Sequence, residues 1–330
     1  MPQNSGIYGV ARIRCHETGL IGRDMMARLI DGSAEEAVRM LVDAGYGSMP
    51  DATVDDMDQL IESELKITYE LVREVSFDPL VTDLFLMKAD VHNLKVLLKL
   101  RLQESKEEPV LMQGGVYPPE VLAHMVQEGD YRELPKPFQQ HLDQLEKAFV
   151  TQVDPVAVSV ALDRAYVEYA YACKLPRKYA FVKEYFRMQA DFNNVLALLR
   201  VREMQGGVEQ LQAMLLPQGD IPHQKLLEAL DTPLEALGKE IAQGPAREGI
   251  LQGLEAMQHG AGISALEKAR DNALMQLISR RRHAFDTIAP VVGYLLAREQ
   301  EARCIRLIIT AKRNGLPVEI ITERLRELYE

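Results

Sequence analysis

Apolar residues recur along the chain at the spacing of amphipathic helices. In the segment 91–98 they stand at i, i+3, i+6 and i+7, and in the segments 195–199 and 305–309 they stand at i, i+3 and i+4. Such spacing collects them on one helical face. The proline-free stretches 177–216 and 246–289 leave room for long helices, because an interior proline removes a hydrogen bond and clashes with the preceding turn. Segments with the strict alternation of β-strands are hard to find, so we predict an all-α protein.

Start and stop signals agree with this interpretation. Thr53-Val-Asp-Asp56 has the pattern of a capping box and predicts the start of a helix. Strongly helical segments are followed by glycine-containing sequences that are typical of helix ends. These are Gly114-Gly115, Gly206-Gly207 and Asn314-Gly-Leu-Pro317.

One helical segment occurs twice. Residues 85–101 align without gaps with residues 186–202, and eight of the 17 positions are identical. Chance would give about one identity, so we interpret the pair as an internal repeat.

A fainter third copy covers residues 301–309, where Glu301 takes the place of Asp90 and Cys304 that of Asn93. A short helical element precedes each copy, within 26–31, 122–127 and 227–231. We therefore predict three similar multihelical repeats with short linkers, which favours repeats that are packed together. Their predicted bounds are 1–115, 116–217 and 218–330.

The repeats share an acid, and two of them share an asparagine three residues later. The pairs are Asp90 with Asn93 and Asp191 with Asn194, while Glu301 stands alone. The preferred interpretation is structural, with these side chains satisfying backbone groups of a neighbouring helix or loop. A metal or catalytic carboxylate pair and a direct contact with a partner protein are the alternatives.

Charge and composition reduce the number of function classes that fit the sequence. The chain of 330 residues carries a net charge of −11, which argues against a general nucleic-acid binder. Three distant cysteines without a CxxC pair fit a reducing cytoplasm. No secretory signal is present, and the notable uncharged run, 287–297, is too short to span a bilayer. Any association with a membrane should therefore be peripheral.

Candidate chemistry is sparse. The sequence has no phosphate-binding loop, no HExxH motif and no nucleophile elbow. We therefore assign no catalytic residue, no cofactor and no metal. The most basic stretch contains Arg280, Arg281 and Arg282. It is interpreted either as a solvated helix face or as an electrostatic contact with an acidic partner or lipid headgroups.

Several segments together resemble a known family. The helix 86–98, the segment 185–195, the C-terminal segment 301–317 and the N-terminal Tyr8-Gly-Val-Ala-Arg-Ile-Arg14 look like the C subunit of the V/A-type ATPase/ATP synthase. Its equivalent in the eukaryotic vacuolar pump is the d subunit. The resemblance covers nearly the whole chain.

The resemblance implies a funnel of three helical repeats around a pseudo-threefold axis. It also implies a non-catalytic central-stalk socket at the cytoplasmic face of the membrane. This socket would couple the central shaft, made of the D and F subunits, to the membrane rotor ring of proteolipid subunits for H+ or Na+ transport. The chain departs from the repeat pattern at Cys304 and at Leu196, which stands where Lys95 and Arg306 occur in the other copies.

Two other functions remain open at this point. One is an all-helical scaffold that binds soluble partners, although most solenoid repeats have 20–50 residues and are shorter than these. The other is an enzyme that uses the Asp and Asn faces. Under that interpretation, replacing Asp90 and Asp191 by Asn should abolish activity, whereas a structural role predicts lower stability.

Overall fold

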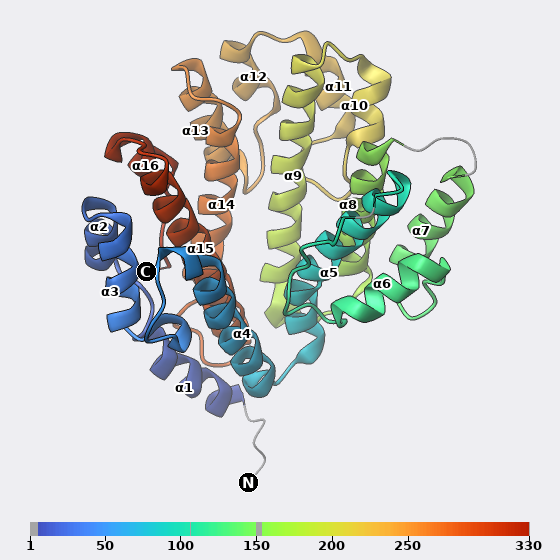
Figure 1. Ribbon diagram of the computed structural model, residues 1–330. Helices are drawn as coiled ribbons and strands as arrows, with labels where there is room; N and C mark the ends of the chain where they lie inside the picture. Colours follow the sequence, from blue (N-terminus) through green and yellow to red (C-terminus); the bar gives the residue numbers. More distant parts are fainter. Residues whose placement is uncertain (1–5, 106, 150–153, 330) are drawn as a thin grey trace. The chain divides into compact units, whose positions relative to one another are not determined.

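The computed structural model describes residues 6–105, 107–149 and 154–329. In these ranges the chain forms sixteen α-helices and four short 3-10 helices, with no β-strand (Figure 1). The all-α prediction is confirmed. The predicted apolar faces are also confirmed, because Leu94, Leu198 and Ile308 are fully buried.

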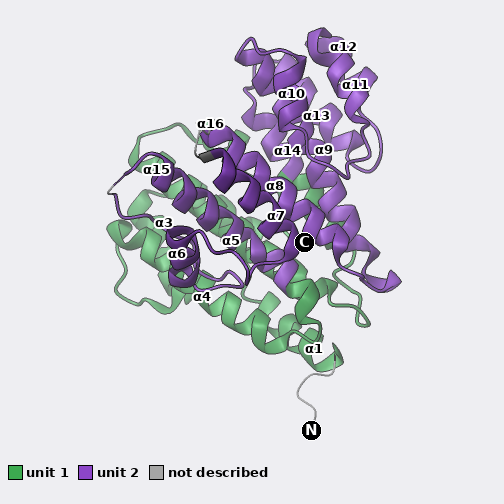
Figure 2. Ribbon diagram, turned by 90° about the vertical axis from the view of Figure 1, so that its right-hand side faces the viewer, with its two compact units in different colours: residues 1–82, 271–330 green, residues 83–270 purple. Residues whose placement is uncertain are grey.

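The chain packs as two compact units (Figure 2). The first unit combines residues 1–82 with residues 271–330, so both ends of the chain contribute to it. The second unit is continuous and comprises residues 83–270.

The first unit is built around two long helices that pack along each other, α4 (Met57–Val75) and α15 (Ala289–Arg313). Helices α1 (Gly6–Glu17) and α3 (Ala34–Asp43) pack on α15. Two short helices, α2 (Arg23–Asp31) and α16 (Val318–Arg324), pack against each other. Apolar side chains from both ends of the sequence fill one core, among them Leu29, Leu41, Leu60, Ile61, Ile305 and Ile308.

The second unit has α8 (Pro155–Ala172) packed between α7 (Lys136–Phe149) and α9 (Ala180–Glu203). Buried aromatic rings join its long helices. The Tyr166 ring meets the Phe186 ring edge-on, with centroids 5.0 Å apart. The Tyr166 hydroxyl also donates to the Leu84 carbonyl at 2.6 Å.

The other helices of the second unit are mostly shorter, and two helices are shared with the first unit. The short helices are α6 (Pro119–Glu128), α10 (Val208–Met214), α11 (His223–Glu228), α12 (Leu234–Ile241) and α13 (Arg247–Gln258). The shared helices are α5 (Pro79–Leu102), which begins in the first unit, and α14 (Ser264–Ser279), which ends there.

The predicted capping box is confirmed at the start of α4. The backbone N–H of Thr53 donates to Asp56 at 2.9 Å, and a 3-10 turn over these residues leads into the helix at Met57. The predicted ends of α9 and α15 are also confirmed. The prediction that Gly114-Gly115 ends a helix is wrong, because α5 already ends at Leu102.

The early end of α5 has a local cause. Glu104 adopts a left-handed backbone with φ of 48°, and the charged segment that follows leads to Pro109. Proline disfavours a helical conformation of the residue before it. Residues 107–118 form no helix, and the end of this segment passes over the acid-bearing face described next.

Candidate functional site

Asp90 and Asn93 project from α5 and hold the loop that follows this helix. Asp90 Oδ2 accepts a hydrogen bond from the backbone N–H of Val116 at 2.6 Å, and Oδ1 accepts one from Tyr117 at 3.1 Å. The Asn93 amide donates to the Met112 carbonyl and accepts from its N–H, both at 2.8 Å. Both the acid and the amide side chain are fully buried.

Asp191 and Asn194 on α9 make the same set of contacts with the next loop. The Asp191 carboxylate accepts from the backbone N–H groups of Asp220 at 3.1 Å and Ile221 at 2.9 Å. The Asn194 amide donates to the Leu216 carbonyl at 3.0 Å and accepts from its N–H at 2.6 Å. The aspartates and asparagines predicted from the repeat therefore meet loop backbone in both copies.

Glu301 on α15 also accepts a hydrogen bond from loop backbone, but the loop lies near the start of the chain. Its Oε1 accepts from the N–H of Ile21 at 2.6 Å, across 280 residues of sequence. Cys304 stands one turn further on. Burial raises the pKa of this thiol, and a hydrogen bond from the backbone N–H of Arg326 opposes that effect.

The three contacts, named here the acid–loop junctions, share one register. In each, a residue bonded to the acid stands two positions before the next helix: Tyr117 before α6, Ile221 before α11 and Ile21 before α2. A glycine stands two positions before that bonded residue in all three loops, at 115, 219 and 19. The backbone thus approaches each acid-bearing helix at a matching place.

Close approach explains the glycine at two of the junctions. A Cβ atom at Gly115 would lie 2.1 Å from Asp90 Oδ1, and one at Gly219 would lie 2.3 Å from Asp191 Oδ1. No side chain fits at such distances, so the hydrogen bonds require a residue without a Cβ.

The third junction contains additional buried charges. Arg298 lies between two carboxylates, with Nη1 2.9 Å from Glu301 and Nη2 3.3 Å from Glu64. Glu64 also accepts the N–H of Gly47 at 2.9 Å. All three charged side chains are buried. The positions that align with Arg298 in the other two copies are Met87 and Met188, so neither copy has an arginine at this place.

Burial changes the proton affinity of two of the acids. It raises the pKa of Asp191 to about 6, although hydrogen bonds from Ile221 and Asp220 act in the opposite direction. Burial likewise raises the pKa of Glu301 to about 7, against the attraction of Arg298 and the hydrogen bond from Ile21. The negative form of each acid depends on the groups that hold it.

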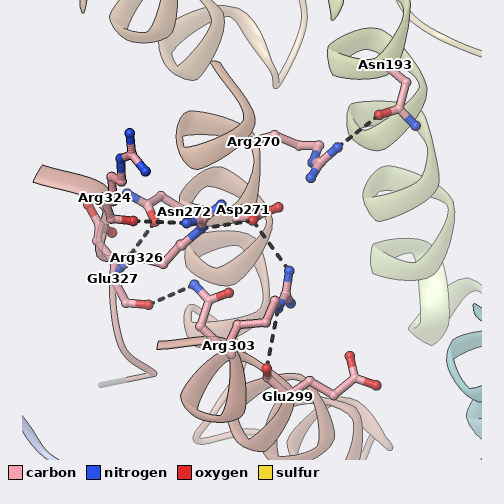
Figure 3. A network of polar contacts seen from close by, with 10 residues as sticks. Asn193, Arg270, Asp271, Asn272, Glu299, Arg303, Arg324, Arg326 and Glu327 are labelled. Carbon is pink, nitrogen blue, oxygen red and sulfur yellow. Dashed lines mark hydrogen bonds and ion pairs between the residues drawn. The ribbon is translucent and has the colours of Figure 1, made fainter. Parts of the chain in front are cut away.

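A further acid ties the C-terminal segment to α14 and α15 (Figure 3). Asp271 Oδ2 lies 3.4 Å from Arg303 Nη1 and 3.2 Å from Arg326 Nε. The neighbouring Asn272 accepts the backbone N–H of Glu327 at 2.9 Å. Arg326 is the same residue whose backbone meets Cys304, so this network fixes the C-terminal segment beside the third junction.

The departures from the repeat pattern have structural counterparts. Lys95 pairs with Asp163 at 2.6 Å, and Arg306 pairs with Asp58 at 2.9 Å. Leu196, at the matching position of α9, is buried instead. At this position α9 packs into the protein interior, and a charged side chain would have to be desolvated there.

Arg280, Arg281 and Arg282 do not lie on a helix face. Helix α14 ends at Ser279, and the three arginines belong to the connection that leads to α15. The interpretation as a solvated helix face is therefore wrong. The side chain of Arg281 donates to the Leu277 carbonyl at 2.8 Å, which caps the end of α14.

Metal-binding clusters and membrane-spanning helices are absent from the described ranges. No three histidines, cysteines or acids gather there in a way that could hold a metal ion. In the same ranges no helix combines the length and apolar character needed to cross a bilayer.

The sequence patterns did not point to the partners at the third junction. Ile21 has no distinguishing motif, and Glu64 looks like an ordinary polar residue of an amphipathic helix. Arg298 and Glu301 stand at i, i+3 with opposite charge, in a helix whose preceding turns are uncharged. That pairing is the one signal that could have suggested a buried ion pair.

A family model described as ATP synthase (C/AC39) subunit matches residues 9–324. The chain belongs to this family. The match includes α5, α9 and α15 with all three acid–loop junctions, and it confirms the resemblance found in the sequence.

Members of the C/AC39 family with curated names are distant but of similar length. The chain is 21% identical over 321 residues to the C subunit of the V-type sodium ATPase of Enterococcus hirae, covering 96% of this chain and 97% of that protein. It is 24% identical over 339 residues to the C subunit of the A-type ATP synthase of Desulfurococcus sp. (strain SY), and this match covers 97% of this chain and 90% of that protein. The protein of the same name from Haloferax volcanii is 21% identical over 337 residues and is covered to 96%, as is this chain.

Replacing Gly219 by Ala should destabilise this C/AC39 protein, because the new methyl group would collide with Asp191. We expect a loss of about 1–3 kcal/mol in the free energy of unfolding, measured by urea denaturation. Gly207→Ala is the matched control, because a Cβ there meets nothing within 4 Å; it should cost less than about 1 kcal/mol. Equal stability of the two variants would contradict the close-approach argument.

The raised pKa of Asp191 predicts a pH effect with a definite sign. A carboxyl group with a pKa of about 6 in the folded state and 3.8 otherwise binds its proton more readily when folded. Its contribution to the free energy of unfolding therefore increases as the pH falls from 7 to 5. Asp191→Asn lacks this contribution, so the wild type should gain stability relative to the variant over this range. Parallel curves of unfolding free energy against pH would rule the effect out.

Removing Arg298 should damage the third junction strongly. Arg298→Met leaves Glu64 and Glu301 buried without their cation, and loss of one partner of a buried pair costs about 3–5 kcal/mol. Arg306→Met breaks an ion pair whose side chains are 45% and 66% exposed and should cost at most about 1 kcal/mol. Thermal unfolding measures the Tm of the two variants. A similar decrease in Tm for both would contradict the predicted difference between the buried and the exposed ion pair.

Proposed function

We propose that this chain is the non-catalytic central-stalk component of a V/A-type rotary ATPase or ATP synthase. In this role it acts as a socket between the central shaft, made of the D and F subunits, and the membrane rotor ring of proteolipid subunits. It would transmit torque between ATP-driven rotation and the transport of H+ or Na+. The site of action would be the cytoplasmic face of the membrane.

The acid–loop junctions are the observation that carries the proposal. Three long helices each fix one loop through a buried acid in the same register. The third junction connects the end of the sequence with its start, as expected if the repeats form a closed set. This supports three repeats around a pseudo-threefold axis, the funnel that the family resemblance implies, with bounds at 1–115, 116–217 and 218–330.

A torque-transmitting part must be stiff, and the junctions favour stiffness. Each loop is held by buried hydrogen bonds, and moving the loop would leave a buried carboxylate without its donors. Apart from the long connection between α5 and α6, most connections between the helices are short, which acts in the same direction. For this reason we assign a structural role to the acids and asparagines of the repeats, which are Asp90, Asn93, Asp191, Asn194 and Glu301.

The hydrogen bonds and ion pairs of the three buried acids support a non-catalytic role. The carboxylates of Asp90, Asp191 and Glu301 are occupied by backbone or arginine donors, so they are poorly placed to bind a substrate. Curated relatives carry the names of a sodium ATPase component and of ATP synthase components. In the proposed complex, nucleotide chemistry belongs to other subunits.

The test is affinity purification of the tagged chain from its own membranes in a mild detergent. We expect mass spectrometry to identify the proteolipid of the ring together with the D and F subunits of the shaft. A tagged Arg298→Met variant provides a control, since a damaged third junction should reduce recovery of all three. Recovery of soluble proteins alone, without any rotary ATPase component, would instead favour a scaffold.

A further inference from the structure

The connection between α14 and α15, residues 280–288, is a basic turn with an exposed aromatic ring. It contains Arg280, Arg281, Arg282 and His283, and the side chain of Phe285 is 72% exposed. Neither Arg280 nor Arg282 forms an ion pair with a described residue. One acid, Asp286, is present in the turn. Arg280 is exposed and Arg282 is half-buried, so the turn presents positive charge beside an exposed apolar ring.

The connection between α8 and α9, residues 173–179, holds a second basic turn. Lys174, Arg177 and Lys178 are exposed, and the turn contains no acid. In the described ranges none of the three pairs with a carboxylate, and Lys178 stacks on the Tyr179 ring at 4.9 Å. This connection precedes α9 as 280–288 precedes α15, so two of the three acid-bearing helices follow a basic turn.

These turns differ from the rest of the chain. Acids outnumber bases by 49 to 38, and many other arginines are paired with acids. Examples are Arg101 with Glu146 and Arg200 with Glu267. The third corresponding connection, Ser76 to Asp78, is short and carries an acid. Each of the two turns thus groups basic side chains that have no carboxylate partner among the described residues.

We propose that the basic turn 280–288 contacts the anionic headgroups of membrane lipids, and that Phe285 enters the boundary between headgroups and acyl chains. The basic turn 173–179, in the other compact unit, is a second and independent contact of the same kind. An arginine or lysine close to an anionic membrane surface increases partitioning about fivefold. An aromatic ring adds apolar burial at the same depth. The attraction acts within about 8–10 Å, so turns with local positive charge can bind despite the net charge of −11.

Lipid explains these features better than an acidic protein does. A specific protein interface buries roughly 800 Å² on each partner and needs a shaped surface. Each turn is a short connection, and 280–288 offers one exposed aromatic ring. A fluid lipid surface adapts to such a contact. The lipid contact would be weak by itself. In the cell it would act in a chain that other protein contacts already hold near the membrane, so it rests on the proposed socket role.

The test is co-sedimentation of the purified full-length chain with vesicles. We compare phosphatidylcholine vesicles with vesicles of phosphatidylcholine and phosphatidylglycerol at low and high salt. The double variant Arg280→Gln/Arg282→Gln should lower partitioning to anionic vesicles about 30-fold at low salt. Phe285→Ala should weaken binding at both salt concentrations, because its contribution is not electrostatic. The triple variant Lys174→Gln/Arg177→Gln/Lys178→Gln tests the second turn in the same way.

The control removes three exposed positive charges outside these turns, Lys136→Gln/Lys239→Gln/Arg247→Gln, and should change partitioning little. Equal losses in the control, or wild-type binding without preference for anionic vesicles, would overturn the inference. Unchanged vesicle binding combined with loss of rotary ATPase components in the affinity purification would assign the turns to an acidic protein partner instead. The vesicle assay needs only the isolated chain, so its failure can be distinguished from failure of the proposed socket role.

Discussion

A carboxylate can leave water only where other donors replace the hydrogen bonds of water, and in this fold the donors are backbone N–H groups of loops. Asp90 and Asp191 each bind two consecutive loop amides, and the neighbouring asparagine binds both polar groups of one further residue. A shift of the loop by one residue would leave a buried charge unsatisfied. Helix and loop positions are therefore coupled at these places, and the short helix that follows each loop is positioned with them.

The third junction meets the same requirement by different means. Glu301 receives one backbone amide, from Ile21, and a guanidinium supplies the other donors. Arg298 brings a second carboxylate, Glu64, into the interior, and Glu64 in turn holds Gly47. The two aspartate junctions thus rely on backbone donors, whereas the glutamate junction relies on a buried network of ion pairs. Because the charges of this network are desolvated, loss of any one of them should destabilise the junction.

Much of the fold and part of the candidate site could be predicted from the sequence. Helical periodicity and the aligned segments identify the helices and single out Asp90 and Asp191, because these signals are local. The partner of Glu301 could not be predicted, since no linear pattern connects residues 280 positions apart. The sequence assigns Gly115 to a helix end, because glycine suits both a helix end and a close backbone approach. Which of the two applies depends on tertiary packing.

The separation of Ile21 from Glu301 has a consequence for the synthesis of the protein. The first two junctions join residues 19–30 positions apart, so they can form soon after each segment leaves the ribosome. At roughly 5–20 residues per second, the N-terminal segment waits on the order of tens of seconds for α15. During this time the apolar residues of α2, α3 and α4 lack the helix that covers them. Nascent chains should therefore be clients of chaperones that shield the N-terminal segment until synthesis is nearly complete.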